Sequence, residues 1–157
     1  MHGHGIAVLG AFIFGLESDS VEDLHQRSDY IRRSGVDAIQ TTILTPYPGT
    51  RLFEKMVRED RLMKTDFPGD WQHYNMFETT FRPHKMSPEA LSAAMTKIWK
   101  KIYSRKNLRM QAIKTFFNCW RPNPVRWARK GLNAALWGFY TNHLTYKRTV
   151  EQYYVEE

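Results

Sequence analysis

The sequence contains a single cysteine, Cys119, among its 157 residues. One thiol excludes a disulfide within the chain, and it excludes a zinc or iron–sulfur site built from cysteines of this chain alone. Long apolar runs are also absent, because no stretch of about eighteen apolar residues occurs that would cross a membrane as a helix. Residues 1–5 carry neither the basic segment nor the cleavage site of a secretory signal, so a cytoplasmic location is expected.

The composition is that of an ordinary folded protein. Apolar residues make up 42% of the chain and charged residues 25%, which excludes a mostly disordered polypeptide. A chain of this length corresponds to about one domain and buries roughly two-thirds of its unfolded surface.

The charge is distributed unevenly. Residues 1–80 contain 8 Lys/Arg and 12 Asp/Glu, whereas residues 81–157 contain 15 Lys/Arg and 4 Asp/Glu. A strongly basic half indicates a polyanionic neighbour, such as nucleic acid, an acidic membrane surface or an acidic protein surface. A basic surface that is merely solvated is the alternative.

The N-terminal part of the sequence predicts a strand, a helix and a second strand. Residues 5–14 form a nearly continuous apolar run, which is typical of a parallel strand buried on both faces. Ser20 and Asp23 are spaced as a helix-capping pair, and Gly35 is placed to end that helix. Residues 36–45 are rich in β-branched side chains and predict the second strand. The order is that of a βαβ unit.

A turn and an aromatic segment follow. Residues 46–50, with two prolines and a glycine, predict the turn. A short helix is expected next, and its buried side is predicted to consist of Leu52, Phe53, Met56 and Val57. Residues 63–86 contain many aromatic residues together with Pro and Gly, and predict an ordered but irregular segment.

The rest of the chain predicts helices. Ser87 and Pro88 mark a helix start. The apolar stripe of that helix is predicted to be Leu91, Met95, Ile98 and Ile102. Further helices are expected over residues 107–120 and 125–144, separated by prolines.

The expected fold class is therefore α/β followed by mostly α. A two-stranded parallel sheet does not stand alone, since parallel sheets need more strands and cover on both faces. Either another chain completes the sheet, or the chain is the end of a larger barrel or doubly wound protein. We favour the second interpretation.

Four short motifs, in a fixed order, carry a family resemblance. Residues 10–17 read GAFIFGLE, and residues 44–53 read LTPYPGTRLF with Arg-Leu at 61–62. Residues 71–74 (WQHY) and 86–89 (MSPE) follow. This series resembles the end of the barrel of radical S-adenosylmethionine enzymes, and more narrowly of the class whose N-terminal domain binds cobalamin. The resemblance covers roughly residues 3–105 of this sequence.

The sequence also departs from the family pattern. The cluster motif Cys-x-x-x-Cys-x-x-Cys, the Gly-Gly-Glu motif, the first four strands and the cobalamin domain are absent from the chain. In the fifth-strand pattern Ile13 and Gly15 match, but Ala11 replaces a glycine and Ser18 stands where glutamate is usual, with Glu17 one place early. The chain is thus expected to be a C-terminal fragment, with barrel elements in residues 1–62 and a helical extension in 63–157.

The resemblance implies S-adenosylmethionine as a cofactor, with a 4Fe–4S cluster and cobalamin only in the full-length parent. At the mouth of a barrel, Ile13 would lay an apolar surface on the adenine ring, and Gly15 would let the backbone approach the nucleoside. Backbone groups of Leu44 and Thr45 would read the edge of the adenine.

Substrate-cavity residues are expected on the second strand. Gln40 and Thr42 share one face of it, whereas Thr41 and Ile43 would face helices. Tyr47 would close over the mouth of the cavity.

Two further features have ordinary interpretations that we favour. His2 and His4 are spaced as two ligands on one strand face, but a stable metal site needs three or four. The tail residues Trp120, Trp127, Trp137 and Tyr140 alternate with cations, which fits an interfacial amphipathic helix or a nucleic-acid surface. We favour a helical cap packed on a barrel, with the Trp side chains in its core and Lys/Arg at its rim.

Two functions stay open at this point. The first is the C-terminal piece of a radical S-adenosylmethionine enzyme, inactive alone, which shapes the nucleoside pocket and a cavity for a small or lipid-like substrate. The second is a basic helical module, over residues 97–148, that binds nucleic acid or an acidic membrane surface. Nucleic acid is the less favoured partner, and membrane-peripheral attachment would modify the expected cytoplasmic location.

Overall fold

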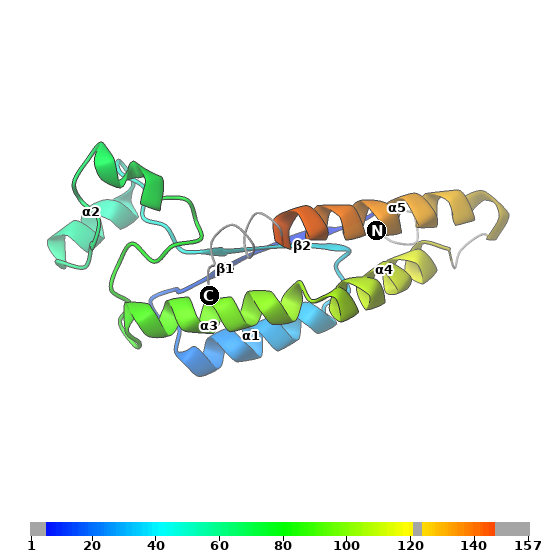
Figure 1. The fold of residues 1–157 in the computed structure, drawn as a ribbon, viewed down its shortest axis with the longest axis horizontal. Coiled ribbons are helices and arrows are strands. Elements are labelled where there is room, and N and C mark those ends of the chain that lie inside the picture. The colour runs from blue at the N-terminus through cyan, green and yellow to red at the C-terminus, as the bar shows by residue number, and fades with distance from the viewer. Residues whose placement is uncertain (1–5, 121–123, 147–157) are drawn as a thin grey trace. The chain divides into compact units, whose positions relative to one another are not determined.

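The structure, a computed structural model, describes residues 6–120 and 124–146 (Figure 1). It contains an α/β part followed by helices, as the sequence predicts. The elements are β1 (Leu9–Phe14), α1 (Val21–Arg33), β2 (Ala38–Ile43), α2 (Arg51–Arg58), the 3₁₀ helix η2 (Gly69–His73), α3 (Pro88–Ile102), α4 (Arg105–Trp120) and α5 (Pro124–Tyr146). No helix among the described residues is long and apolar enough to cross a membrane.

The chain forms two compact units. The first consists of Met1–Phe12, Arg27–Gln40 and Lys97–Glu157, and the second of Ile13–Gln26 and Thr41–Thr96. The strands β1 and β2 and the helices α1 and α3 contribute residues to both units. The expected division at residue 62 stays a prediction.

The strands β1 and β2 are adjacent and parallel. In the first unit the Ala38 N–H donates to the Val8 carbonyl at 3.1 Å, and in the second the Leu44 N–H donates to the Phe14 carbonyl at 2.8 Å. The partners are offset by the same number of residues in both pairs, which is the register of parallel strands. The predicted βαβ unit is confirmed, and the sheet contains two strands among the described residues.

The helix α1 begins at the predicted capping pair. The Ser20 N–H donates to the Asp23 carboxylate at 2.9 Å, and the Asp23 N–H donates to the Ser20 hydroxyl oxygen at 3.3 Å. Each side chain thereby satisfies a backbone donor of the first turn. Gly35 follows the helix with φ of +75°, a left-handed conformation that glycine adopts at little cost.

In the first unit, side chains from helices satisfy the backbone of β2. The Asn142 amide accepts from the Ile39 N–H at 2.9 Å and donates to the Asp37 carbonyl at 3.4 Å, so it pairs with β2 as a neighbouring strand would. The Tyr103 hydroxyl donates to the Ile39 carbonyl at 3.1 Å. All three groups are buried, and the bonds fix α5 and the end of α3 against β2.

The helix α5 approaches β2 closely at Gly138. A Cβ at this position would lie 2.7 Å from the Asp37 carbonyl oxygen, so only glycine fits. The helices α4 and α5 run side by side and antiparallel (Figure 1). The hairpin that they form therefore meets the start of β2 at a glycine and at an amide.

Asp37 is buried, and both of its carboxylate oxygens accept hydrogen bonds. Its Oδ2 accepts from the Val8 N–H at 2.6 Å, and its Oδ1 accepts from the Thr115 hydroxyl at 2.7 Å. Hydrogen bonds to a charged acceptor are among the stronger ones in proteins. They link the entry to β1, the entry to β2 and the middle of α4 within one unit.

The second unit has its own core. Thr50 caps α2 by accepting from the Phe53 N–H at 3.2 Å, and Met56 is buried beneath the helix. The prediction of a buried Val57 was wrong, since this side chain is 53% exposed. Val57 follows Met56 by one residue, which is a rotation of about 100° around the helix axis, so its side chain points into solvent.

The long helix α3 buries the stripe that the sequence predicts. Leu91 and Met95 are buried in the second unit, and Ile98 and Ile102 are buried in the first. Their spacing of three and four residues keeps them on one face of the helix.

One face of β1 is open. Leu9 and Ile13 are 45% and 50% exposed, whereas Phe14 is fully buried on the other face. The sequence predicts exposed apolar side chains on an open side of the sheet, from Ile6, Val8 and Phe12 or their neighbours. Ile6 is exposed as predicted, whereas Val8 and Phe12 are half-buried and their neighbours Leu9 and Ile13 are the exposed ones. The sequence of β1 is typical of a strand buried on both faces, so its uncovered face indicates that a group outside the described residues packs against it.

The amide of Asn142 gives the first prediction. Asn142→Leu should destabilise the protein by about 2 kcal/mol, because the Ile39 N–H and the Asp37 carbonyl lose a buried partner. Urea unfolding measures the loss, and hydrogen exchange should show faster exchange at the Ile39 amide. Asn133→Leu, an exposed position on the same helix, should change stability by less than about 0.5 kcal/mol. Equal effects of the two substitutions would refute the strand-like role of Asn142.

Candidate functional site

The candidate site lies at the carboxyl ends of β1 and β2 in the second unit. The Leu44 N–H donates to the Phe14 carbonyl, which joins the two strand ends. Ile13 presents half of its side chain to solvent one residue before the buried Phe14. The predicted adenine-contacting residues Ile13, Gly15, Leu44 and Thr45 thus belong to two adjoining strand ends.

Gly15 has a structural reason to be glycine. Its φ is +82°, and a Cβ would lie 3.0 Å from Leu91 Cδ2. The turn geometry and the packing of Leu91 therefore account for this glycine without a ligand. Close approach of its backbone to a nucleoside stays a prediction.

Asp19 holds the turn after β1, a role that the sequence analysis missed. Its buried carboxylate accepts from the Gly15 N–H at 3.1 Å and from the Leu16 N–H at 2.9 Å. The sequence does contain a signal for this role. An Asp four residues after the glycine is close enough for its carboxylate to accept hydrogen bonds from the backbone of the turn.

The end of β2 is fixed by its backbone. The Ile43 N–H donates to the Met76 carbonyl at 2.8 Å, and the Thr45 hydroxyl donates to the Ile43 carbonyl at 3.2 Å. The Leu44 N–H is committed to Phe14, so it does not serve an adenine. The backbone candidates for the adenine edge are consequently the Leu44 carbonyl and the Thr45 amide.

The two faces of β2 differ as expected. Gln40 is exposed and Thr42 half-buried, whereas Thr41 and Ile43 are buried. The alternation confirms which side chains share a face. That Gln40 and Thr42 line a substrate cavity stays a prediction.

Tyr47 packs at the edge of an aromatic cluster. Its ring centroid lies 6.3 Å from that of Tyr74, which is buried and donates its hydroxyl to the Lys64 carbonyl at 2.6 Å. Thr50 fixes the turn by donating its hydroxyl to the Tyr47 carbonyl at 2.7 Å. Tyr47 is itself 37% exposed, so part of its ring is available to a ligand.

A network of charged groups lies in the same unit. Arg61 Nη1 is 2.9 Å from Glu59 Oε2, 3.2 Å from Glu17 Oε1 and 2.8 Å from His84 Nε2. Lys55 Nζ lies 2.7 Å from both Glu17 oxygens. The hydrogen bond from Lys55, reinforced by Arg61, holds the pKa of Glu17 below its ordinary value.

This network does not make a metal site. Ligand atoms of Glu17, Glu59 and His84 lie within 4.8 Å of one another, which is close enough for a shared ion. However, the Arg61 guanidinium contacts all three, and its positive charge opposes a second cation there. The network is better explained as an ion-pair cluster around the buried Arg61.

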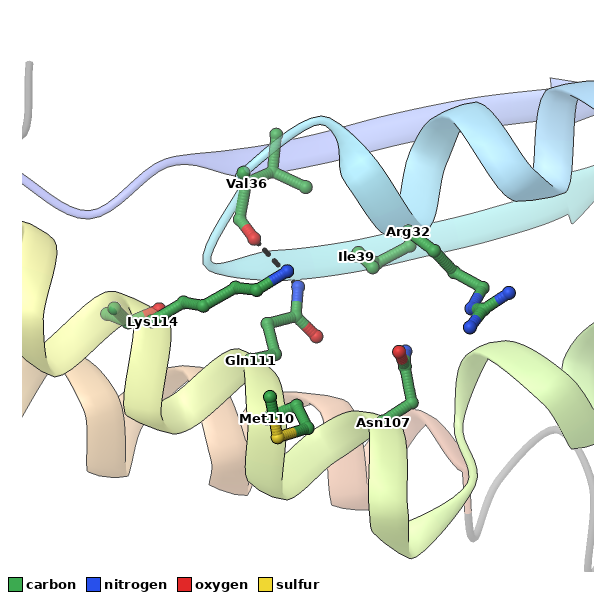
Figure 2. Close-up of a pocket in the computed structure, with 9 residues that line it drawn as sticks. Arg32, Val36, Ile39, Asn107, Met110, Gln111 and Lys114 are labelled. Carbon is green, nitrogen blue, oxygen red and sulfur yellow. Dashed lines mark hydrogen bonds between the residues drawn. The ribbon is translucent and has the colours of Figure 1, made fainter.

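The first unit contains a small cavity between α1, β2 and α4 (Figure 2). Its volume is about 20 Å³, which is room for about one water molecule and far too little for a nucleoside. The Gln111 amide crosses it to donate to the Val36 carbonyl at 2.7 Å (Figure 2). The cavity therefore belongs to the packing of the hairpin and not to the predicted cofactor site.

Part of the chain matches a known protein family. Residues 50–136 match the family described as "Domain of unknown function (DUF4070)". The match runs from the turn before α2 into α5, so it includes the α4–α5 hairpin.

Curated relatives are methyltransferases by name. The bacteriochlorophyllide d C-12(1)-methyltransferase of Chlorobaculum tepidum is 30% identical over 157 residues, which is 98% of this chain and 29% of that protein. The bacteriochlorophyllide d C-8(2)-methyltransferase of the same organism is 23% identical over 109 residues, 69% of this chain and 23% of that protein. An uncharacterized methyltransferase of Pyrococcus horikoshii is 27% identical over 109 residues, again 69% of this chain and 23% of that protein. The chain thus spans less than a third of the length of these relatives.

The charged network gives the second prediction. Glu17→Gln should lower stability at neutral pH, because it removes the ion pairs with Lys55 and Arg61. The folded-state pKa of Glu17 lies below 4.5, so its contribution is present above that pH and is lost as the pH falls through the folded-state value. Unfolding curves of the two proteins should therefore converge in acid.

Glu54→Gln, an exposed carboxylate on α2, is the control and should show a smaller pH-dependent difference. A stability gap for Glu17→Gln that persists unchanged in acid would contradict the account of the network.

Proposed function

The chain belongs to the DUF4070 family and corresponds to the C-terminal part of a cobalamin-binding-class radical S-adenosylmethionine protein, and we propose that the whole protein is a methyltransferase. The resemblance read from the sequence is confirmed at the level of the family. The proposal of methyl transfer is supported by the names of three relatives from two organisms. Within that protein, the chain would shape the nucleoside pocket and the substrate cavity.

The adenine end of S-adenosylmethionine is assigned to the end of β1. Ile13 offers an exposed branched aliphatic surface beside a turn that Asp19 holds rigid, and such a surface suits the flat face of a purine. In barrel enzymes, functional groups gather at the carboxyl ends of the strands, which is where Ile13 lies. The exposed Ile13 is the observation that carries the proposal.

The substrate side is assigned to β2 and the turn after it. Gln40 and Thr42 are the polar side chains on the uncovered face of β2, and Tyr47 follows the strand with part of its ring exposed. An amide, a hydroxyl and an aromatic ring suit a substrate that is mainly apolar and carries a few polar groups. Such a substrate is small or lipid-like.

The residues of this chain suit the adenine of S-adenosylmethionine but do not suit a 4Fe–4S cluster. The apolar Ile13 fits an adenine, as argued above. A 4Fe–4S cluster does not fit, because it needs several thiolates and the sequence contains one cysteine. The cluster and cobalamin would accordingly be held by other parts of the whole protein, and no step of this proposal passes through them.

A substitution at Ile13 gives the third prediction. In the intact protein, Ile13→Asp should weaken S-adenosylmethionine binding at least about tenfold, because a carboxylate replaces the apolar surface beneath the purine. Isothermal titration measures the affinity.

Leu9→Asp is the matched control, since Leu9 is an equally exposed residue on the same face of β1 but at the opposite end of the strand. It should leave the affinity near that of the wild type. Wild-type affinity in Ile13→Asp would show that β1 does not carry the adenine.

A substitution at Gln40 gives the fourth prediction. Gln40→Ala should leave S-adenosylmethionine affinity unchanged and lower the rate at which the intact protein methylates its substrate, by up to about tenfold for one lost hydrogen bond. Thermal unfolding should be unaffected, because Gln40 is exposed. A loss of cofactor affinity, or an unchanged rate, would remove Gln40 from the substrate side.

A further inference from the structure

The hairpin of α4 and α5 has an outer face that is both apolar and basic. The two helices pack side by side within the first unit (Figure 1). Between them lies a groove of about 280 Å³ whose lining is apolar throughout, formed by Ala112, Ile113, Phe116, Phe117, Leu132, Ala135, Leu136 and Phe139. We call this groove and the exposed residues around it the hairpin face.

The α5 side of the hairpin face is mainly apolar. Its exposed side chains between residues 132 and 144 are Leu132, Asn133, Leu136, Trp137, Phe139, Tyr140 and Leu144. The buried side of the same helix consists of small or polar residues, Ala134, Ala135, Gly138 and Asn142. The helix is thus inverted relative to an ordinary surface helix, whose larger apolar residues face the core. Trp137 and Tyr140 are exposed, so the described part of this chain does not form the core that was expected for the tail aromatics, whereas the side chains of Trp120 and Trp127 lie outside the described residues. Their burial against a barrel stays a prediction.

The α4 side adds cations to the same face. Lys106, Met110, Ile113 and Phe117 are exposed and follow one another at spacings of four, three and four residues, so they share one stripe of the helix. Lys114 is exposed beside them. Residues 105–146 contain eight Lys/Arg and no Asp or Glu, so the hairpin has a strong positive charge.

We propose that the hairpin face docks onto the surface of an anionic lipid bilayer. Exposed aliphatic and aromatic side chains would enter the boundary between headgroups and acyl chains. Lys106 on the α4 stripe and Lys114 beside it would reach lipid phosphates. Trp137 and Tyr140 are the residue types that prefer this boundary. The absence of any carboxylate in residues 105–146 removes the charge that would be repelled by anionic lipid.

A protein partner suits the hairpin face less well than a membrane does. The interior of a protein interface is depleted of charged residues, because their desolvation is costly. Lys106 lies within the apolar stripe of α4, where a protein cover would have to desolvate its ammonium group. At a membrane surface the same stem lies along apolar groups while the ammonium stays at the phosphate level.

A nucleic acid also fits less well. Binding to bases uses aromatic planes for stacking, together with cations for phosphate. Beside the exposed rings of Phe117, Trp137, Phe139 and Tyr140, the hairpin face exposes at least as many aliphatic side chains. Among them are Ile113, Leu132 and Leu136, which offer no stacking plane and would stay uncovered by bases. The proposal does not depend on the proposed methyl transfer, and its test needs no cofactor.

The test is partition of the intact protein into vesicles. Wild-type protein should sediment with vesicles of phosphatidylglycerol and phosphatidylcholine in equal parts, and not with vesicles of phosphatidylcholine alone. Leu136→Glu and Lys114→Glu should each lower the partition coefficient about tenfold, the first by placing a charge among acyl chains and the second by reversing a headgroup contact.

Matched controls come from the same unit. Tyr30→Glu, an exposed aromatic residue on α1, and Lys100→Glu, an exposed cation on α3, should leave partition unchanged. A synthetic single-stranded RNA is the competing probe, and it should bind the wild type more weakly than the anionic vesicles do.

Three results would overturn the proposal. The first is a wild-type protein that does not partition into anionic vesicles. The second is RNA binding that Lys114→Glu weakens while Leu136→Glu does not, which would indicate a nucleic-acid surface. The third is a large loss of thermal stability for Leu136→Glu in lipid-free buffer, which would indicate that another part of the protein covers the hairpin face.

Discussion

A two-stranded parallel sheet leaves much of its backbone without a strand partner, and the rest of the fold is arranged to satisfy that backbone. In the first unit the Asn142 amide and the Tyr103 hydroxyl take the N–H and the carbonyl of Ile39. In the second unit the Met76 carbonyl accepts from the Ile43 N–H, and Met76 adopts φ of +70° to present it. Left-handed backbone is unfavourable for methionine, so this contact is maintained at a cost in conformational energy.

The same shortage of strands explains what stays uncovered. Helices and loops cover Phe14, Thr41 and Ile43, whereas Ile13 and Gln40 are left open on the opposite faces of their strands. Parallel sheets are normally covered on both faces, so an exposed apolar residue such as Ile13 is unusual in one. The chain spans 29% of the length of the bacteriochlorophyllide d C-12(1)-methyltransferase of Chlorobaculum tepidum. The uncovered strand faces are where we propose that cofactor and substrate bind.

The sequence predicted the elements well because their signals are local. The Ser20–Asp23 capping pair and the apolar stripe through Leu91 and Met95 each lie within a few turns of helix. Asn142 and Gly138 could not be predicted, because their role depends on contacts with Asp37 and its neighbours about a hundred residues earlier in the chain.

The candidate site was predictable only in part, for a related reason. A strand pattern tells which residues share a face, and this was correct for Gln40 and Thr42. It does not tell which backbone donors are already used, and the Leu44 N–H proved to be committed to the Phe14 carbonyl. The Arg61 cluster was missed because Glu17 and His84 lie 44 and 23 residues from Arg61, so no sequence spacing marks them as its neighbours.

The most direct test of the central claim is photolabelling of the intact protein with an azidoadenine analogue of S-adenosylmethionine, followed by peptide mapping. The account predicts that label appears within residues 13–15 or 44–47, and that excess S-adenosylmethionine prevents it. Label confined to other parts of the protein, with none on these two strand ends, would contradict it.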